Sequence, residues 1–473
     1  MEQFDLVVIG SGPGGYRAAV LAALHGLRAA IVEQGQWGGT CLNRGCVPKK
    51  AWYHSARLVA ASRDFAGRGI TGALSGDLAR AWRHQRDVVA SVRASYADYL
   101  KRLGVSRHEG VARFAGRDVI SVGAGFLQAP HILVATGSTP FVPPGLPRSR
   151  ARVLTTDDLF DAGPPDGERV AVIGSGVIGT EFAFILSMLG RDVVWLTQHA
   201  PLTRSAYSEP ARKALESRLA AYGIAARTGG RVVGYRLDGD GVILGLPEGG
   251  EERVDWVLLG AGRVPRTADL DLARAGVAVN AAGFIEVDAA QRTSAAGIYA
   301  IGDVANPAMT SNHALADAAV AVGHIIAPDC TATLRPDVPQ VVYSALELAR
   351  VGLNQDAAEA EGYEPAVGFT SFATSPAALA EGDAEGFVRI VADMDSGRLL
   401  GAELAGSHAG ELIHLLGPEF GSADALQRLA SIAYNHPARA EEILNAVETL
   451  AAKWGLPLPQ LPPGRRKHHS APP

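Results

Sequence analysis

The most informative pattern of hydrophobic and polar positions occurs twice along the chain. Residues 7–33 and residues 171–197 each contain an apolar run, a glycine-rich turn, an apolar stretch with helical spacing, a single glycine and a second apolar run. An apolar run, a turn, a periodic stretch and another apolar run predict a strand, a helix and a strand. The pattern therefore predicts two similar strand-helix-strand units.

Shorter apolar runs that end in glycine or an acid predict further strands at residues 132–137, 256–262 and 297–303. From about residue 338 the pattern changes to strands at 340–343, 386–392 and 399–404, followed by helices at 409–416 and 438–453. This order is typical of an α+β domain. We therefore expect an α/β protein with two Rossmann-like nucleotide-binding domains and a C-terminal α+β domain.

Composition narrows the class of protein. The 473 residues correspond to roughly three domains of ~150 residues, and 55 glycines suit a turn-rich α/β protein. A net charge of −5 is too mild to indicate nucleic acid or an anionic membrane as the main partner. No run approaches the ~20 apolar residues of a membrane span and no signal peptide is evident, so we expect a cytoplasmic protein. Three cysteines cannot form the disulfide framework of a secreted protein.

The glycines of the first turn have the spacing of a dinucleotide-binding motif. They are Gly10, Gly12, Gly14 and Gly15, which form G-x-G-x-x-G between an expected strand and an expected helix. The first glycine allows the tight turn, the next lets the backbone approach a pyrophosphate, and the last lets the helix pack against the strand. Glu33 ends the following strand, where a carboxylate can accept hydrogen bonds from ribose hydroxyls. An adenine dinucleotide is therefore expected here.

The second turn repeats these glycines but lacks the acid. The glycines are Gly174, Gly176 and Gly179. Thr197 occupies the position that matches Glu33, so the site loses an acceptor for the ribose 2′-hydroxyl and the repulsion that would exclude a 2′-phosphate. His199 and Arg204 could bind such a phosphate or could be ordinary surface residues. We expect NAD as the principal cofactor of this unit, with NADP possible.

Cys41 and Cys46 form a C-x4-C segment just beyond the second strand of the first unit. A metal site would need four ligands, and the sequence has no second cysteine pair or histidine cluster with ligand spacing, so no metal is expected. A free buried pair is another interpretation. Against it, the pair adjoins the expected dinucleotide at a glycine-rich approach to a helix, where a thiolate would be stabilised. Pairing between the cysteines is therefore expected to be chemical rather than structural.

The residues around this pair resemble the pyridine nucleotide:disulfide oxidoreductase family, the FAD enzymes with a redox-active disulfide. The match runs from about residue 4 to about residue 455 and is most specific in the GGTCLN and GCVP sequences at the two cysteines. Other matching pieces are Ala135-Thr136-Gly137, GRVP beginning at Gly262, YAIGD ending at Asp303, QVVYS at 340–344 and AGELI at 409–413. The resemblance implies FAD on the first unit, NAD(P) on the second and a C-terminal interface domain that makes a homodimer.

The resemblance also implies a domain layout and cofactor contacts. The expected domains are 1–147 for FAD, 148–272 for NAD(P), 273–336 for a return to the central part, 337–456 for dimerisation and 457–473 for a proline-rich tail. Asp303 would hold the ribityl chain of the flavin, and Lys49 or Lys50 would contact the flavin with Glu181 as ion partner. The other implied cofactor contacts are Gly39, Thr40, Ala135, Thr136, Gly137 and Gly262.

The family carries its acid-base pair on an H-P-x-x-x-E segment, which His436 and Glu441 match. Glu441 would orient the imidazole and stabilise its protonated form, so that His436 can accept and return a thiol proton near neutral pH. A proline followed by an acid is also ordinary chemistry at a helix start, but the cysteine motif favours the catalytic interpretation. Tyr434 and Ala438 depart from the usual histidine and threonine, which affects substrate fit more than chemistry. In such enzymes the histidine reaches the active site of the partner subunit.

Three functions are compatible with these residues. The chain most resembles the dihydrolipoamide dehydrogenases, in which the dithiol of a lipoyl-bearing protein reacts at Cys41 while Cys46 becomes a thiolate beside the flavin. An NADPH enzyme like glutathione reductase, acting on a small disulfide, is an alternative, although Val20 and Ala319 stand where its arginines would bind glutathione. Mercuric and large thioredoxin reductases need a C-terminal cysteine pair, whereas Cys330 is alone. An inactive flavin-binding interaction protein is disfavoured because the catalytic residues remain.

Overall fold

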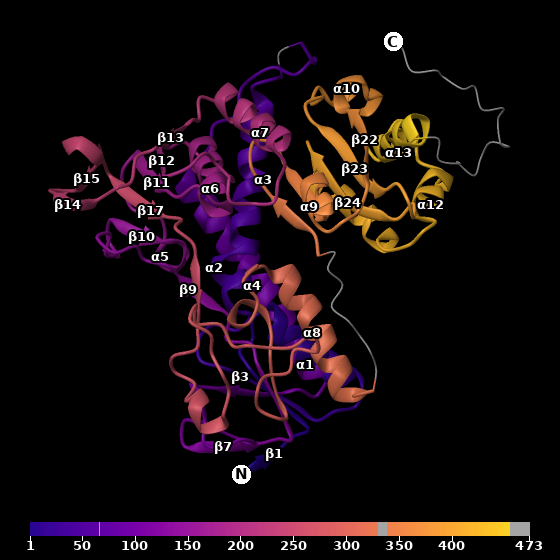
Figure 1. Cartoon of the computed structure of the whole chain (residues 1–473). Coiled ribbons are helices and arrows are strands. Elements are labelled where there is room, and N and C mark those ends of the chain that lie inside the picture. The colour runs from indigo at the N-terminus through magenta and orange to yellow at the C-terminus, as the bar shows by residue number, and fades with distance from the viewer. Residues whose placement is uncertain (66, 330–337, 455–473) are drawn as a thin grey trace. The chain divides into compact units, whose positions relative to one another are not determined.

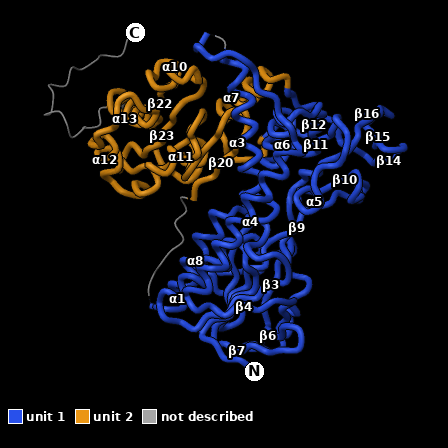
Figure 2. The backbone as a smooth tube through the Cα atoms, turned by 180° about the vertical axis from the view of Figure 1, so that it is seen from behind, with its two compact units in different colours: residues 1–201, 224–336 blue, residues 202–223, 337–473 orange. Residues whose placement is uncertain are grey.

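The computed structural model of the protein describes residues 1–65, 67–329 and 338–454. The chain forms two compact units (Figure 2). The first comprises Met1–Pro201 and Ile224–Pro336, and the second comprises Leu202–Gly223 and Asp337–Pro473. The finer division expected from the sequence remains a proposal. Cys330 and the expected tail at 457–473 lie outside the described residues.

The first repeat folds into strand β2 (Leu6–Ile9), helix α1 (Pro13–Leu24) and strand β3 (Ala29–Glu33). These strands belong to a parallel sheet in the order β19-β8-β2-β3-β4, whose other members are β19 (Ile298–Ala300), β8 (His131–Val134) and β4 (Ser106–Glu109). Alternate residues of β2 face opposite sides. Leu6 and Val8 pack towards α1 and α8 (Ser311–Ile326), which lie side by side (Figure 1), whereas Val7 and Ile9 join a second cluster. Burial on both faces explains why β2 is apolar throughout.

The second repeat folds in the same way, as β11 (Arg169–Ile173), α6 (Val177–Met188) and β12 (Asp192–Thr197). Its parallel sheet has the order β10-β17-β11-β12-β13, with β10 (Val153–Thr155), β17 (Trp256–Leu259) and β13 (Ala226–Thr228). Helix α5 (Thr156–Ala162) follows β10 directly. The predicted pair of Rossmann-like units is therefore confirmed.

Three helices and several small sheets complete the first unit. The helices are α2 (Gly39–Arg44), α3 (Cys46–Ser62) and α4 (Leu78–Arg102). The small sheets have the strand orders β1-β7-β6-β5, β14-β15-β16 and β18-β9. Their strands are β1 (Glu2–Gln3), β5 (Ala112–Phe114), β6 (Val119–Val122), β7 (Gly125–Gln128), β9 (Ser138–Pro140), β14 (Gly234–Asp238), β15 (Gly241–Gly245), β16 (Glu251–Val254) and β18 (Arg263–Pro265). Gly45 has φ −135° and ψ −113°, which breaks the helix and separates α2 from α3.

The second unit is built on an antiparallel sheet in the order β20-β21-β24-β23-β22. Its strands are β20 (Gln340–Val342), β21 (Leu348–Gly352), β22 (Pro365–Ser371), β23 (Phe387–Asp393) and β24 (Leu399–Ala405). Its helices are α7 (Glu209–Ala221), α9 (Gln355–Ala360), α10 (Pro376–Glu381), α11 (Ala409–Leu412), α12 (Ala425–Ser431) and α13 (Glu441–Trp454). The α+β architecture expected from the sequence is confirmed, although β21 and β22 were not expected individually.

Two predicted helices differ in extent from the observed ones. The helix expected at 409–416 is α11 followed by a 3₁₀ turn at Ile413–Leu415. The helix expected from residue 438 begins at Glu441. The residues before it form tighter turns, in which the Glu441 amide donates to the Ala438 carbonyl oxygen three residues earlier (3.1 Å), and the Glu441 side chain caps the Ala438 amide (2.8 Å). Helix α7 belongs to the second unit, where the Ser208 amide at its N-terminus donates to Glu403 of β24 (2.8 Å).

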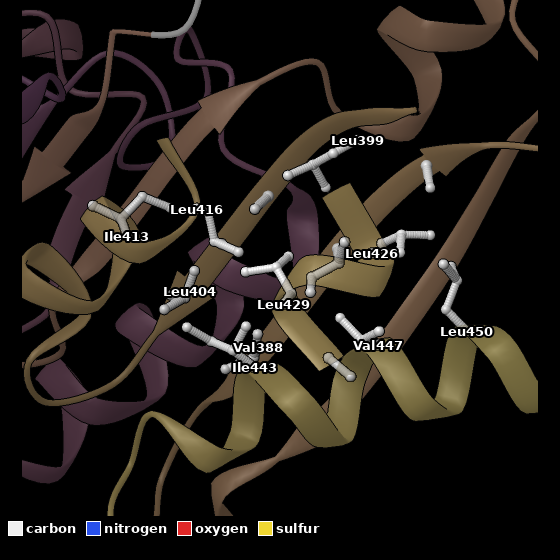
Figure 3. Packing of buried hydrophobic residues seen from close by; sticks show 14 of the residues in the cluster. Val388, Leu399, Leu404, Ile413, Leu416, Leu426, Leu429, Ile443, Val447 and Leu450 are labelled. Atoms are coloured by element: carbon white, nitrogen blue, oxygen red, sulfur yellow. The ribbon is translucent and has the colours of Figure 1, made fainter. Parts of the chain in front are cut away.

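The core of the second unit lies between its sheet and the helices that cover it (Figure 3). Val388 and Leu404 of the sheet face Ile443, Val447 and Leu450 of α13. The three α13 positions are spaced by four and three residues, so they share one face of the helix. Truncating Ile443 or Leu450 to alanine is expected to cost about 2–5 kcal/mol.

Candidate active site

The first glycine turn is shaped by close backbone contacts that only glycine allows. A Cβ atom on Gly10, which has φ +104°, would lie 2.4 Å from the Ala135 carbonyl oxygen, and one on Gly15 would lie 1.9 Å from the Gly10 carbonyl oxygen. A Cβ atom on Gly12 would meet nothing within 4 Å. The outer two glycines therefore hold strand, turn and helix together. Gly12 leaves an open backbone surface at the N-terminus of α1, where a pyrophosphate can approach.

The second glycine turn has the same construction. A Cβ atom on Gly174, which has φ +137°, would lie 2.3 Å from the Gly260 carbonyl oxygen, and one on Gly179 would lie 2.1 Å from the Gly174 carbonyl oxygen. A Cβ atom on Gly176 would again meet nothing within 4 Å. Two turns with an open central glycine give the first unit two places for a dinucleotide.

Glu33 lies at the end of β3, beside the first turn. Its Oε2 accepts from the Ser11 amide (2.9 Å) and hydroxyl (2.7 Å), and its Oε1 accepts from the Gly35 amide (2.8 Å). A carboxylate has about four acceptor positions, so these bonds leave capacity for ribose hydroxyls. The position and orientation of Glu33 suit its proposed role at the ribose.

Thr197 is placed differently from Glu33. Its side chain is buried at 2% exposure, and its Oγ1 has no hydrogen-bond partner among the described residues. A side chain with so little accessible surface offers almost nothing to a nucleotide. The burial of Thr197 therefore weighs against its proposed contact with the cofactor.

The two cysteines lie on different helices and are free thiols, with Cys41 inside α2 and Cys46 at the first position of α3. Their side chains are hydrogen-bonded to each other, and this bond is the main reason why the pKa of Cys41 is raised well above its ordinary value. The same bond is the main cause that lowers the pKa of Cys46, to about 6. The pair is therefore polarised, with the thiolate favoured at Cys46 and the thiol at Cys41.

Lys49 is the lysine that acts on this pair. Its Nζ forms a 2.6 Å ion pair with Oε2 of Glu181, whose side chain is 2% exposed. The charge of Lys49 lowers the pKa of Cys46, and Glu181 raises it. Lys50 has its Nζ 5.6 Å from the centre of the Tyr53 ring. The pairing of Lys49 with Glu181 supports Lys49, rather than Lys50, as the proposed flavin contact.

Two neighbours of the cysteines were not identified from the sequence. Ser311, the first residue of α8, has its Oγ 3.3 Å from Cys46 Sγ and lowers the pKa of both cysteines. Tyr96 of α4 stacks on Tyr16 with 4.3 Å between ring centres. The pKa of Tyr96 is raised mainly by burial, and also by the charges of the two cysteines. Both residues come from elements far along the chain, so no local pattern could have indicated them.

The loop before α2 brings the cysteine segment against the first glycine turn. Gly39 has φ +63°, and a Cβ atom there would lie 2.6 Å from the Gly12 Cα atom. Thr40 follows it on α2, immediately before Cys41. Asn43 ties the loop to the helix, since its Nδ2 donates to the carbonyl oxygens of Trp37 (3.0 Å) and Gly39 (2.8 Å). The first nucleotide turn and the redox helix are therefore in direct backbone contact.

The remaining predicted contacts lie around the end of β8. The Ala135 amide donates to the Ile9 carbonyl oxygen (2.8 Å), and Thr136 Oγ1 donates to the Arg266 carbonyl oxygen (2.7 Å). Gly137 and Gly262 both have positive φ, at +71° and +107°. Gly14 is closely packed, since a Cβ atom there would lie 3.1 Å from the Ala314 carbonyl oxygen of α8. Asp303 follows β19, and its Oδ2 accepts from the Ser138 hydroxyl (2.6 Å).

His436 and Glu441 form a pair in the second unit. His436 Nδ1 lies 2.9 Å from Glu441 Oε1, and Glu441 Oε2 accepts from the Ala438 amide. The bond to His436 is the main cause that lowers the pKa of Glu441. The His436 side chain is 72% exposed. Tyr434 donates to the Leu429 carbonyl oxygen (3.2 Å), and its burial raises its pKa to about 12.

Fold and site together define the class of protein. The chain belongs to the pyridine nucleotide-disulphide oxidoreductase family, whose model matches residues 4–323 and whose dimerisation-domain model matches residues 338–447. It is an FAD- and pyridine nucleotide-dependent enzyme. The open surface at Gly12 beside Glu33 fits FAD at the first turn, and the open surface at Gly176 fits the pyridine nucleotide at the second.

Individual relatives make the likeness more specific. The dihydrolipoyl dehydrogenase of Thermus scotoductus is 38% identical over 463 residues, covering 95% of this chain and 98% of the relative. The glutathione reductase of Burkholderia cepacia is 34% identical over 419 residues, covering 87% and 91%. The crystal structure of LpdA from Mycobacterium tuberculosis shares the fold, with a TM-score of 0.88 at 24% identity over 95% of this chain and 99% of that one. The HOCl-induced flavoprotein disulfide reductase RclA from Escherichia coli has a TM-score of 0.82 at 25% identity, covering 94% and 99%.

Two kinds of feature are absent from the described residues. None of the described helices combines the length and apolar character needed to cross a membrane. Within the same described ranges, no group of three histidine, cysteine, aspartate or glutamate residues could hold a metal ion.

Proposed function

We propose that the protein is a dihydrolipoyl dehydrogenase, which oxidises the dithiol of a dihydrolipoyl group with NAD⁺. The observation that carries the proposal is the polarised pair of Cys41 and Cys46, placed in backbone contact with the first nucleotide turn. The Thermus relative of the same name, alike over nearly the whole length of both chains, supports this substrate class.

The reaction begins with the two cysteines joined as a disulfide. A thiolate of the substrate attacks Cys41 Sγ, the bond between the cysteine sulfurs breaks, and Cys46 leaves as a thiolate. The second substrate thiol then attacks the mixed disulfide and releases Cys41, so the substrate closes its own disulfide. Two electrons pass from the substrate to the cysteine pair, and His436 accepts a proton from the substrate dithiol. Bound FAD supplies the two-electron transfer from the cysteine pair to NAD⁺.

Lys49, Glu181 and Ser311 would set the charge at Cys46 during this step. The positive charge of Lys49 and the Ser311 hydroxyl favour a thiolate leaving group, and the buried carboxylate of Glu181 holds the lysine in place. The residues proposed to hold FAD are Gly10, Gly12, Gly14, Gly15, Glu33, Gly39, Thr40, Lys49, Ala135, Thr136, Gly137 and Asp303. Those proposed for the pyridine nucleotide are Gly174, Gly176, Gly179 and Gly262, while Glu181 remains the ion partner of Lys49.

The proposed assembly is a homodimer in which His436 serves the partner's cysteines. Two facts support it: the family's dimerisation domain is present, and the His436 side chain is largely exposed in a single chain. Mixing Cys41→Ser and His436→Ala chains through dissociation and refolding tests the arrangement. If the histidine acts in trans, one working site returns in each mixed dimer. If it acts in cis, no activity returns however completely the chains exchange.

A substrate comparison tests the function itself. The purified enzyme would be assayed with dihydrolipoamide and NAD⁺, and with glutathione disulfide and NADPH, and kcat/KM compared. The proposal requires higher kcat/KM for dihydrolipoamide and NAD⁺, with turnover lost in Cys46→Ser. Wild-type turnover of dihydrolipoamide by Cys46→Ser would exclude the mechanism.

A glutathione-reductase-like activity is the second candidate. Thr197 favours it, because no acid at that position repels the 2′-phosphate of NADPH, and the Burkholderia relative supports it. Val20 and Ala319 weigh against it, since neither can supply a cation for the carboxylates of glutathione. A large preference for NADPH and glutathione disulfide in the same assay would replace the main proposal by this one.

A further inference from the structure

We propose that Arg263 is a positioning residue of the flavin site, which acts on Asp303 through the hydroxyl of Ser138. The three residues come from separate parts of the first unit. Arg263 begins β18, Ser138 begins β9, and Asp303 lies in the 3₁₀ turn Gly302–Val304 after β19. Strands β18 and β9 pair antiparallel, with Arg263 opposite Pro140. The inference rests on FAD being held by the first nucleotide unit.

The direction of every hydrogen bond in this chain of contacts is fixed by chemistry. An arginine side chain can only donate, and Arg263 Nε donates to Ser138 Oγ at 2.7 Å. The same hydroxyl has one hydrogen to donate, and its Oγ lies 2.6 Å from Asp303 Oδ2. Because Ser138 already accepts from the arginine, its hydrogen is donated to the carboxylate. Arg263 therefore determines where the Ser138 hydroxyl points.

The guanidinium is itself held at two further points. Its Nη2 donates to the Ser138 carbonyl oxygen (3.0 Å), and its Nη1 lies 3.4 Å from Asp157 Oδ1, near the N-terminus of α5. The side chains of Arg263 and Asp157 are each 13% exposed, so water competes little for these bonds. Ser138 is 3% exposed. A lysine could not make the same contacts, because it lacks the planar fork that serves hydroxyl and carbonyl together.

Asp303 is thereby oriented with Oδ1 free to accept. Its Oδ2 accepts from Ser138, and its Oδ1 has no hydrogen-bond partner among the described residues. The turn that carries it is fixed from behind, since the buried Asp317 of α8 accepts from the Gly302 amide at 3.0 Å. A hydroxyl of the flavin ribityl chain would donate to Oδ1. The contacts of Arg263 thus prepare the acceptor before FAD arrives.

The expected effect is on FAD retention. Losing the charged donor in Arg263→Met lets the Ser138 hydroxyl rotate away, and weakening one hydrogen bond to a charged group corresponds to about tenfold faster FAD release. Ser138→Ala breaks the link at its centre and is expected to have a similar effect. If Arg263 acts through the Ser138 hydroxyl, the variant that carries both Arg263→Met and Ser138→Ala releases FAD no faster than Ser138→Ala alone.

The test measures FAD release from the holoenzyme after dilution, by the rise of flavin fluorescence, together with the visible circular dichroism of the bound flavin. Arg274→Met is the matched control. The Arg274 side chain is 67% exposed, and its ion pair with Asp271 is long (3.9 Å), so its loss should not affect the flavin site. Wild-type release from Arg263→Met overturns the proposal, and so does a double variant whose effect is the product of the single ones. No dithiol substrate is used, so the outcome is independent of the proposed reaction.

Two further variants keep the test decisive if Arg263→Met does not fold. Arg263→Lys should retain FAD better than Ser138→Ala but less well than the wild type, because lysine restores the charge without the two directed donors. Ser138→Ala should release FAD about tenfold faster than the wild type, with an altered flavin dichroism. Wild-type release and dichroism in Ser138→Ala would overturn the proposal on its own.

Discussion

The charge balance around Cys46 leads to a prediction in which two neighbouring substitutions act in opposite directions. Lys49 lowers the pKa of the Cys46 thiol and Glu181 raises it, while an ion pair of 2.6 Å joins the two side chains. Lys49→Met keeps the length of the side chain but removes the charge that stabilises the thiolate. Glu181→Gln keeps an acceptor for Lys49 but removes the opposing charge. The first change should raise the pKa of Cys46, and the second should lower it.

The size of the effect follows from the geometry of α3. Cys46 and Lys49 are three residues apart on this helix, which puts their Cβ atoms about 5–6 Å from each other. Taking about 6 Å also for the separation of the ammonium and the thiolate, and an effective dielectric constant of about 20, two unit charges interact by about 2.8 kcal/mol. Water on the exposed side of Cys46 reduces this energy by about half, to about 1.4 kcal/mol. That corresponds to a shift of about one unit in the pKa of Cys46.

The assay is the rate at which iodoacetamide alkylates Cys46 in the reduced enzyme, followed peptide by peptide by mass spectrometry over a range of pH. Only the thiolate reacts, so the rate rises with pH and its midpoint reports the pKa. In the wild type the midpoint should lie near 6, with the thiolate present above it and lost as the pH falls through it. The two cysteines are coupled, so the midpoint is read as a property of the pair.

The matched control is Lys50→Met, because Lys50 is the neighbouring lysine and its ammonium lies over the Tyr53 ring. It should move the midpoint much less than Lys49→Met does. Shifts of the same sign in Lys49→Met and Glu181→Gln would refute the electrostatic reasoning. An equal shift in Lys50→Met would show that a general loss of positive charge, not the pairing with Glu181, controls the thiol.

Three further predictions concern single positions. Ser311→Ala should raise the alkylation midpoint of Cys46 by less than Lys49→Met, because its hydroxyl is the weaker influence; no change would remove Ser311 from the site. Gly15→Ala should prevent folding of the first unit, since its Cβ atom would lie 1.9 Å from the Gly10 carbonyl oxygen, and a thermal melt will show this. Gly12→Ala should fold but lose FAD, which the flavin content of the purified protein will show. Thr197→Val should raise the free energy of unfolding by about 1 kcal/mol in a urea titration, because it removes a buried hydroxyl without a partner, and should leave the KM for NAD⁺ unchanged.

The parts of the fold that could be predicted from sequence are those encoded over short distances. An apolar run, a glycine turn and a helical period lie within about 27 residues in each repeat, and both repeats form the predicted strand, helix and strand. The expected helix from residue 438 shows the limit of this approach. Its apolar spacing begins before Glu441, but residues 438–440 form tighter turns with bonds to the amide three residues on, and the α-helix starts later.

Contacts between distant segments could not be predicted in this way. Ser311 lies 265 residues beyond Cys46, and Ser138 is separated by 125 residues from Arg263 and by 165 from Asp303. No period or motif connects such positions, and each is an ordinary helix or strand residue by local pattern. The sequence also does not show which of Lys49 and Lys50 acts on Cys46. Both lie within one helical turn of Cys46, and the ion pair of Lys49 with Glu181 on a separate helix is a contact that the local sequence does not indicate.

The surroundings of the two cysteines also give a reason for the order of attack that does not depend on any relative. A disulfide breaks most readily when the sulfur that leaves has the lower pKa, because it departs as the more stable thiolate. Here the positive charge of Lys49 favours the thiolate at Cys46, whose pKa is lowered, whereas the pKa of Cys41 is raised. An incoming thiolate that attacked Cys46 would have to expel Cys41, the poorer leaving group. Attack at Cys41 is therefore the easier course, and it leaves the thiolate beside the ammonium of Lys49.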